Sequence, residues 1–308
     1  MKKLLGFATL LILLSNCQKT GNEPFYEEGT KEINGTNLYY KIIGEGEPLL
    51  IIHGGPGLSH DYFMPHLAPL SEKFQLIFYD QRASGGSSKE LDPSSISLEN
   101  FLKDIDGIRE SLGLAKINIL AHSWGGLLGM KYATAYPQRC DALVLVNSVG
   151  ASSEVRALNN QKVAERFTKQ DSVDRAQLLN SEGFRNLEPQ TIEQLMKIGF
   201  RQQFHNPALL DSLNLSIRTD FGETNELLQN LAQDLTEYDF HEELTKISIP
   251  TLLIYGDYDP LTEIAGARLK QSIPNAERQL LNNCGHFPFI EKPEAFVRTV
   301  TDFLKRSK

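Results

Sequence analysis

Short apolar segments alternate with amphipathic ones along the first half of the chain. The pattern predicts strands at residues 38–43, 49–52, 74–79, 117–121 and 141–147, and helices at 98–112 and 125–136. Strand 49–52 is apolar at every position, which is typical of a strand buried on both faces. Strands that alternate with helices pair in parallel. The sequence therefore predicts an α/β fold, a mostly parallel, twisted sheet flanked by helices.

The alternation stops at residue 150 and resumes at residue 247. Residues 150–246 are polar and largely helical by pattern. After them the pattern predicts strands at 251–255 and 278–281 and helices at 262–272 and 293–305. Open α/β sheets bind ligands at the carboxyl ends of their strands. We therefore predict a core formed by 30–149 and 247–308, with 150–246 inserted as a helical cap over the site.

The first residues have the pattern of a secretion signal. Two lysines precede the apolar run 4–14, which is shorter than the apolar segment that a membrane-spanning helix needs. The sequence Leu-Ser-Asn-Cys at 14–17 resembles a bacterial lipobox, in which the cysteine is lipidated. We expect a signal peptide at 1–16 and a lipidated Cys17 that begins a polar tether ending at residue 29. A plain cleaved signal or an uncleaved anchor is the alternative. With lipidation, the protein would be a bacterial lipoprotein of the cell envelope, held to a membrane outside the cytoplasm.

Composition narrows the possible partners. The chain has 31 Lys and Arg against 39 Asp and Glu, a formal net charge of −8, which argues against nucleic acid or anionic lipid as a partner. Three cysteines are too few to suggest a disulfide framework, and the sequence does not tell whether Cys140 and Cys284 pair. Cysteine and histidine form no cluster with metal-ligand spacing. We expect neither a metal nor a cofactor, and the oligomeric state stays open.

A serine lies between a predicted strand and a predicted helix, in Ala-His-Ser-Trp-Gly at 121–125. Small residues two before and two after the serine allow the sharp turn that raises its hydroxyl above the sheet. This strand–turn–helix context indicates a nucleophile elbow and an α/β-hydrolase fold. Ser123 is the predicted nucleophile.

A serine hydroxyl needs a base, and a histidine serves best when a carboxylate fixes its tautomer. In this fold the order along the chain is serine, acid, histidine. His286 follows the last predicted strand, and both Asp257 and Asp259 follow strand 251–255. We predict His286 as the base and one of the two aspartates as its partner. His122, next to the serine in the elbow, is expected to be structural.

The glycine-rich segment His-Gly-Gly-Pro-Gly at 53–57 follows strand 49–52. Its backbone should therefore lie beside the elbow, where glycines let amide groups approach a substrate closely. We predict the backbone amides of Gly55 and Trp124 as the oxyanion donors. His53 is expected to brace this loop.

The segment 53–57, the Asp-Gln-Arg at 80–82 and the elbow at 121–125 resemble the motifs of the proline iminopeptidase (prolyl aminopeptidase) family of α/β-hydrolases. The resemblance extends over about residues 30–305. It implies release of an N-terminal residue, preferentially proline, from small peptides through an acyl-enzyme at Ser123. The family pattern places the acid three residues after a glycine, which favours Asp259 over Asp257.

An aminopeptidase must recognise a free ammonium group, and a buried carboxylate can do so. Family members place acidic residues in the cap for this purpose. By their distance upstream of the acid, Glu223 and Glu193 are the candidates for substrate binding. The alternative is that each is a solvated charge on a helix.

Two other functions are compatible with this pattern. An esterase of small acyl esters would use the same triad under a more apolar cap. A non-catalytic binding protein could be built on the same scaffold, although such proteins usually lose a triad member. A serine at position 123 argues against epoxide hydrolases and haloalkane dehalogenases, which need a carboxylate nucleophile there.

Overall fold

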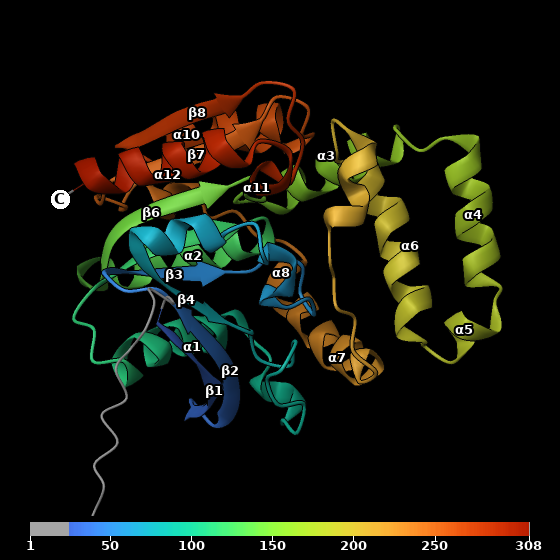
Figure 1. Ribbon diagram of the computed structural model, residues 1–308, viewed down its shortest axis with the longest axis horizontal. Helices are drawn as coiled ribbons and strands as arrows, with labels where there is room; N and C mark the ends of the chain where they lie inside the picture. The colour runs from blue at the N-terminus through green and yellow to red at the C-terminus, as the bar shows by residue number, and fades with distance from the viewer. Residues whose placement is uncertain (1–24, 308) are drawn as a thin grey trace, which may run out of the picture.

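The computed structural model describes residues 25–307, so the predicted signal peptide and Cys17 lie outside the described residues. An eight-stranded sheet has the order β1-β2-β4-β3-β5-β6-β7-β8 (Figure 1). β1 and β2 are antiparallel to their neighbours, and the other strands pair in parallel. The strands are β1 (Tyr26–Ile33), β2 (Thr36–Ile43), β3 (Glu47–Ile52), β4 (Phe74–Tyr79), β5 (Ile117–His122), β6 (Cys140–Val146), β7 (Thr251–Gly256) and β8 (Ala276–Leu281).

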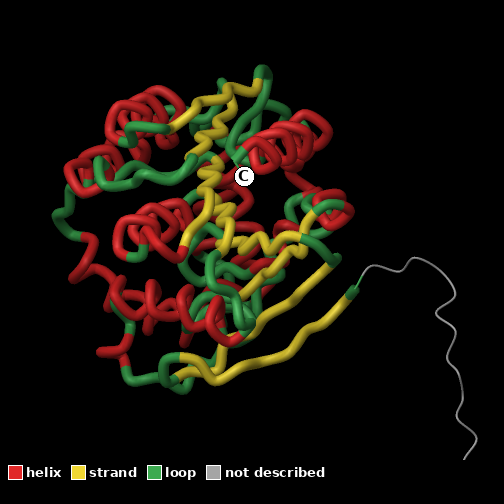
Figure 2. The backbone as a smooth tube through the Cα atoms, turned by 90° about the vertical axis from the view of Figure 1, so that its left-hand side faces the viewer, coloured by secondary structure: helices red, strands yellow, loops and turns green. Residues whose placement is uncertain are grey.

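Helices cover both faces of the sheet (Figure 2). On one face the core includes α1 (Leu98–Ser111), α2 (Trp124–Ala135) and α10 (Ala267–Ser272), and on the other it includes α12 (Pro293–Arg306). Successive residues of β3 point to opposite faces, so Leu50 joins the first core and Leu49 the second. This explains why the inner strands are continuously apolar. The predicted parallel sheet is confirmed.

Shorter helical elements connect the strands and helices of the α/β domain. They are η1 (His60–Phe63), η2 (Ala68–Glu72), η3 (Pro93–Ser95), η4 (Pro137–Arg139), the π-helical turn η7 (Thr262–Gly266) and α11 (Pro288–Glu291).

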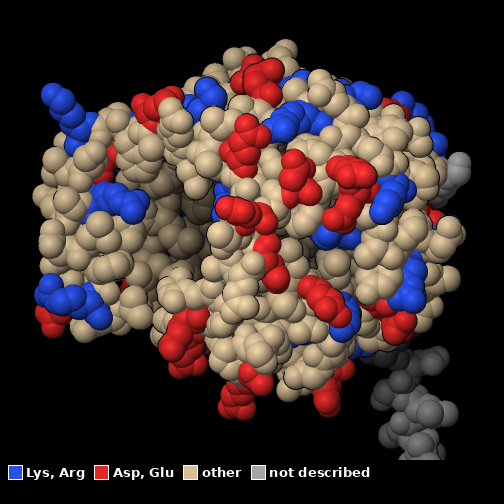
Figure 3. All heavy atoms as spheres, turned by 180° about the vertical axis from the view of Figure 1, so that it is seen from behind, with Lys and Arg blue, Asp and Glu red and all other residues tan. Residues whose placement is uncertain are grey.

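The chain between β6 and β7 forms helices, as predicted. These are α3 (Ser153–Ala164), α4 (Lys169–Leu179), α5 (Glu182–Arg185), α6 (Pro189–Arg201), η5 (Pro207–Ser212), α7 (Phe221–Leu228), η6 (Gln229–Leu231), α8 (Ala232–Leu235) and α9 (His241–Leu244). Helices α4, α5 and α6 form a lobe beside the sheet (Figure 1). Seen from behind, the surface is deeply hollowed between this lobe and the rest of the molecule, and acidic and basic side chains lie interspersed (Figure 3).

The predicted start of the core at residue 30 is wrong by four residues. Strand β1 begins at Tyr26, which pairs with Ile43, so residues 26–29 belong to the sheet and not to a tether. A hairpin causes this, because Asn34 and Gly35 both have positive φ angles (48° and 73°) and form a tight turn. β1 is an edge strand with mostly exposed side chains, so it lacks the apolar pattern of the inner strands.

Within residues 25–307, no helix combines the length and the apolar character needed to cross a bilayer. Over the same residues, no group of three or more histidine, cysteine or acidic side chains is arranged to hold a metal ion. Cys140 and Cys284 are both buried free thiols and do not pair.

Candidate active site

Ser123 lies at a sharp turn between β5 and α2. Its backbone has φ 54° and ψ −120°, a conformation that non-glycine residues rarely adopt. Its amide donates a hydrogen bond to the Val146 carbonyl on β6 at 3.0 Å. A Cβ atom at Gly125 would lie 2.5 Å from the Ile52 carbonyl oxygen, so only glycine fits there. This close packing holds the turn that presents the serine hydroxyl.

The structure brings Ser123, His286 and Asp259 together. The Nε2 atom of His286 lies 3.0 Å from Ser123 Oγ, and its Nδ1 atom lies 2.6 Å from Asp259 Oδ2. His286 and Asp259 are each 3% exposed. A carboxylate can only accept, so Nδ1 carries the proton and Nε2 presents a lone pair to the serine hydroxyl. This arrangement can remove the serine proton during attack on a carbonyl carbon.

Asn147 also contacts the acid, and sequence reasoning missed it. Its Nδ2 group donates to Asp259 Oδ2 and, at 3.3 Å, to the Gly285 carbonyl. Asn147 directly follows β6 and has a positive φ of 41°, but its sequence context carries no signal for this role. Asp257, by contrast, is exposed and accepts a hydrogen bond from the Cys284 amide at 3.1 Å. The geometry therefore selects Asp259 as the partner of the histidine.

The glycine-rich loop after β3 lies directly against the serine. A Cβ atom at Gly54 would lie 2.8 Å from Ser123 Cβ, and Gly55 has a φ of 58°. Among residues 25–307, the backbone amides of Gly55 and Trp124 donate to no other protein group. Both predicted donors are therefore available to a substrate oxygen.

A chain of buried hydrogen bonds links this loop to the histidine loop. The Gly54 amide donates to Tyr62 Oη at 2.5 Å, and the Tyr62 hydroxyl donates to His122 Nδ1 at 2.8 Å. His122 Nε2 then donates to the His286 carbonyl at 2.9 Å. Burial lowers the pKa of His122 well below its ordinary value, so the ring is neutral and can both accept and donate. The part played by Tyr62 was not predicted.

His53 has the bracing contacts expected of it. Its Nε2 atom accepts from the Gln81 amide at 3.0 Å, and its Nδ1 atom donates to the Gly54 carbonyl at 2.9 Å. Burial lowers the pKa of His53, which favours the neutral ring that these bonds require. Gln81 in turn accepts from the indole nitrogen of Trp124 at 2.9 Å. Gln81, within the segment 80–82, thus forms hydrogen bonds to both the glycine-rich loop and the elbow.

A chamber of about 50 Å³ adjoins the serine. Its wall contains two glycines, apolar and aromatic side chains, and Ser123 and the two histidines His122 and His286. None of the described residues on this wall is acidic. The wall residues are Gly54, Gly55, Leu58, Tyr62, His122, Ser123, Phe200, Leu215, His286 and Phe287. A free ammonium group in this chamber would meet no carboxylate.

The two predicted ammonium ligands, Glu223 and Glu193, lie outside the wall of the chamber. Glu223 is exposed on α7, and Glu193 on α6 forms an ion pair with Lys197 at 3.0 Å. Neither lines the chamber. Distance along the chain placed both residues in the cap, but it could not tell which face of a short helix points toward the serine.

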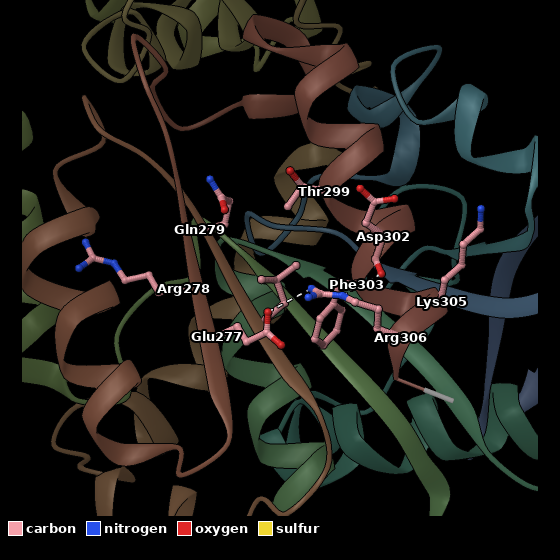
Figure 4. A pocket seen from close by; sticks show the side chains of 9 residues that line it. Glu277, Arg278, Gln279, Thr299, Asp302, Phe303, Lys305 and Arg306 are labelled. Carbon is pink, nitrogen blue, oxygen red and sulfur yellow. Dashed lines mark hydrogen bonds and ion pairs between the residues drawn. The ribbon is translucent and has the colours of Figure 1, made fainter.

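A second cavity, of about 500 Å³, lies between β8 and α12 (Figure 4). Polar and charged side chains line it, including Glu277 and Arg306, whose ion pair measures 3.2 Å. Its described wall holds no histidine, cysteine or serine that could act as a base or a strong nucleophile. The chamber at Ser123 is therefore the candidate active site.

A sequence model of the family described as "alpha/beta hydrolase fold" matches residues 47–293, which include the elbow, the cap and the histidine. The chain belongs to this α/β-hydrolase family. Proline iminopeptidases are among its curated relatives. That of Lactobacillus crispatus is 28% identical, with 90% of this chain and 97% of the relative covered. That of Saccharolobus solfataricus is 27% identical over 90% of this chain and 92% of its own length. The resemblance predicted from the motifs is confirmed.

Solved structures show the same fold for this α/β-hydrolase. VinJ superposes with a TM-score of 0.70 at 23% identity, covering 92% of this chain and 99% of VinJ. Proline iminopeptidase of Mycobacterium smegmatis gives a TM-score of 0.68 at 20% identity, covering 91% of this chain and 98% of that one. These similarities confirm the predicted α/β-hydrolase fold.

Proposed function

We propose that this α/β-hydrolase is a serine aminopeptidase that releases N-terminal residues, preferentially proline, from small peptides. The observation that carries the hydrolase chemistry is the hydrogen-bonded series from Ser123 through His286 to Asp259. The proline iminopeptidase relatives, which align along nearly their whole length, support the choice of substrate.

In the proposed mechanism, Ser123 Oγ attacks the carbonyl carbon of the N-terminal residue while His286 Nε2 takes the hydroxyl proton. Asp259 holds the imidazole in the required tautomer and stabilises its charged form. The amides of Gly55 and Trp124 donate to the oxyanion. His286 then gives its proton to the departing amine, which leaves an acyl-enzyme on Ser123. Water, deprotonated by His286, hydrolyses this ester and restores the serine.

Three chromogenic substrates test this proposal: proline 4-nitroanilide, its N-acetylated form and 4-nitrophenyl acetate. An aminopeptidase should cleave the free-amine proline substrate far faster than the acetylated one, and Ser123→Ala should abolish that cleavage. Equal cleavage of the free and acetylated forms would contradict recognition of a free amino terminus.

An esterase is the second candidate, and the chamber supports it. The described wall carries no carboxylate for an ammonium group, so an uncharged acyl group suits it better. Cleavage of 4-nitrophenyl acetate without cleavage of the proline amide would favour the esterase. Failure of a fluorophosphonate probe to label Ser123 would instead indicate a non-catalytic protein.

We further propose that the protein is exported and anchored to a membrane of the cell envelope through a lipid on Cys17. The support is the pattern of residues 1–17 alone. Expression in a bacterium fed a radiolabelled fatty acid tests this. The parent chain should carry label and sediment with membranes, whereas Cys17→Ser should carry none. An unlabelled parent chain would contradict the anchor.

A further inference from the structure

A hollow of about 660 Å³ lies within the cap, between α3, α4 and α6. Its wall is mainly apolar and includes Val163, Phe167, Leu195, Met196 and Phe200. Arg175 is its single charged side chain among the described residues. The hollow is far larger than the chamber at the serine and falls in the size range of ligand pockets.

A glycine on the wall indicates that the space is kept open. Gly199 lies inside α6, and a Cβ atom built on it would meet no atom within 4 Å. Its φ is not positive, so neither packing nor backbone conformation requires glycine there. Glycine inside a helix is less stable than alanine, because it loses more backbone freedom on folding. Because glycine has no side chain, space remains beside residue 199 that no atom of the described protein fills.

The hollow and the chamber at the serine share one wall residue, and two residues of the hollow contact the histidine loop. Phe200 lines both the hollow and the chamber, and its ring packs edge-on against Phe287 with centroids 5.3 Å apart. The backbone carbonyl of Gln203, also on the wall of the hollow, accepts a hydrogen bond from the His286 amide at 2.7 Å. In serine hydrolysis the histidine returns its proton to the leaving group, so the leaving part of the substrate lies on the side of the histidine.

We propose that this hollow is a subsite for apolar side chains in the leaving part of a peptide, beyond the bond that Ser123 attacks. The proposal rests on the proposed function, because it requires acyl transfer at that serine. The apolar wall favours side chains such as leucine and phenylalanine. The guanidinium of Arg175 disfavours lysine and arginine there.

Two prolyl tripeptides test the subsite, one with leucine and one with glycine at both positions after proline. In the parent protein kcat/KM should favour the leucine peptide by about 10- to 100-fold, as expected for burial of an apolar side chain. In Gly199→Leu, whose new side chain occupies the hollow, this preference should fall to about threefold or less. Gly199→Ala, which adds one methyl group, should lie between.

Gln194→Leu is the matched control, since it adds the same side chain at an exposed position of the same helix. It should keep the preference of the parent protein. Equal preferences in Gly199→Leu and Gln194→Leu would overturn the subsite but leave the proposed function intact. An unlabelled Ser123 in a fluorophosphonate assay of the parent protein would overturn both. Thermal unfolding of each variant separates these outcomes from misfolding.

Discussion

The loops around Ser123 and the cap above them are built in opposite ways. Around the serine, Cβ atoms at Gly54 and Gly125 would come within 3 Å of neighbouring atoms, and buried polar groups donate and accept in chains. In the cap, a Cβ atom at Gly199 would meet no atom within 4 Å, and the residue lies on the wall of an open, mainly apolar hollow. The loops thus fix the reacting groups in one geometry, whereas the cap can change its lining at little cost to folding. Mutations in the loops should therefore change kcat, and mutations in the cap should change substrate preference.

The largest effect is expected at the acid. In Asp259→Asn the amide cannot hold His286 in the required tautomer, so kcat should fall by about 10⁴-fold with little change in folding. Asp257→Asn is the control in the same turn, because its side-chain oxygen can still accept from the Cys284 amide. Its kcat should stay close to that of the parent protein. If Asp257→Asn were the more damaging change, the assignment of the acid would be wrong.

Alanine at two glycines should have opposite effects on stability. Gly125→Ala places a methyl group 2.5 Å from the Ile52 carbonyl oxygen, which should lower the free energy of unfolding by about 3 kcal/mol or more. Gly199→Ala should raise it by about 0.5–1 kcal/mol, because alanine favours the helix. Urea denaturation measures both. A stable Gly125→Ala protein would mean that the elbow is less constrained than its contacts indicate.

Most of the sheet could be predicted because buried parallel strands carry a strong apolar signal. Residues 49–52 are apolar and buried, and so are residues 74–79 except Gln75, because both strands lie inside the sheet. β1 was missed because an edge strand needs no such pattern, and the Asn-Gly turn at 34–35 was its only local signal. The elbow could be predicted because the sharp turn itself demands small residues.

Residues that act through distant contacts could not be predicted. Tyr62 lies on a short helical turn 60 residues before His122, and nothing near it in the sequence indicates their hydrogen bond. Asn147 reaches Asp259 across 112 residues of chain. Such roles depend on how separate loops meet at the edge of the sheet, which neither periodicity nor spacing encodes.

Removing the Tyr62 hydroxyl should show whether its hydrogen bonds position the loops around Ser123 or only stabilise the fold. Tyr62→Phe leaves the buried Gly54 amide and His122 Nδ1 without partners, which should cost about 1–3 kcal/mol of stability. The freed loop should also lower kcat by about tenfold while KM changes little. Tyr132→Phe is the matched control, since that hydroxyl is buried too but donates to Asp106 at 2.9 Å. Equal loss of kcat in both variants would indicate a general effect of destabilisation.

Stability should fall in mild acid because two histidines are buried in the neutral form. Burial lowers the pKa of His122 and His53 in the folded state, so below pH of about 6.5 the unfolded chain binds protons that the folded chain does not. The free energy of unfolding should then drop by up to about 1.4 kcal/mol per pH unit for each histidine. Urea denaturation at pH 7.5 and 5.5 measures this slope. His122→Gln should reduce the slope, whereas replacing the exposed His205 should not.

The smallest effect is expected at the cap acids. Glu223 is exposed and Glu193 is paired with Lys197, so Glu223→Gln and Glu193→Gln should each change KM for a proline substrate by about twofold or less. A tenfold rise in KM confined to free-amine substrates would contradict this, because only a carboxylate that contacts the ammonium group distinguishes free from acetylated termini. Such a result would mean that the cap closes over bound peptide and brings an acid to the chamber. The cap would then be adaptable in its position over the serine as well as in the side chains that line it, whereas the loops stay fixed.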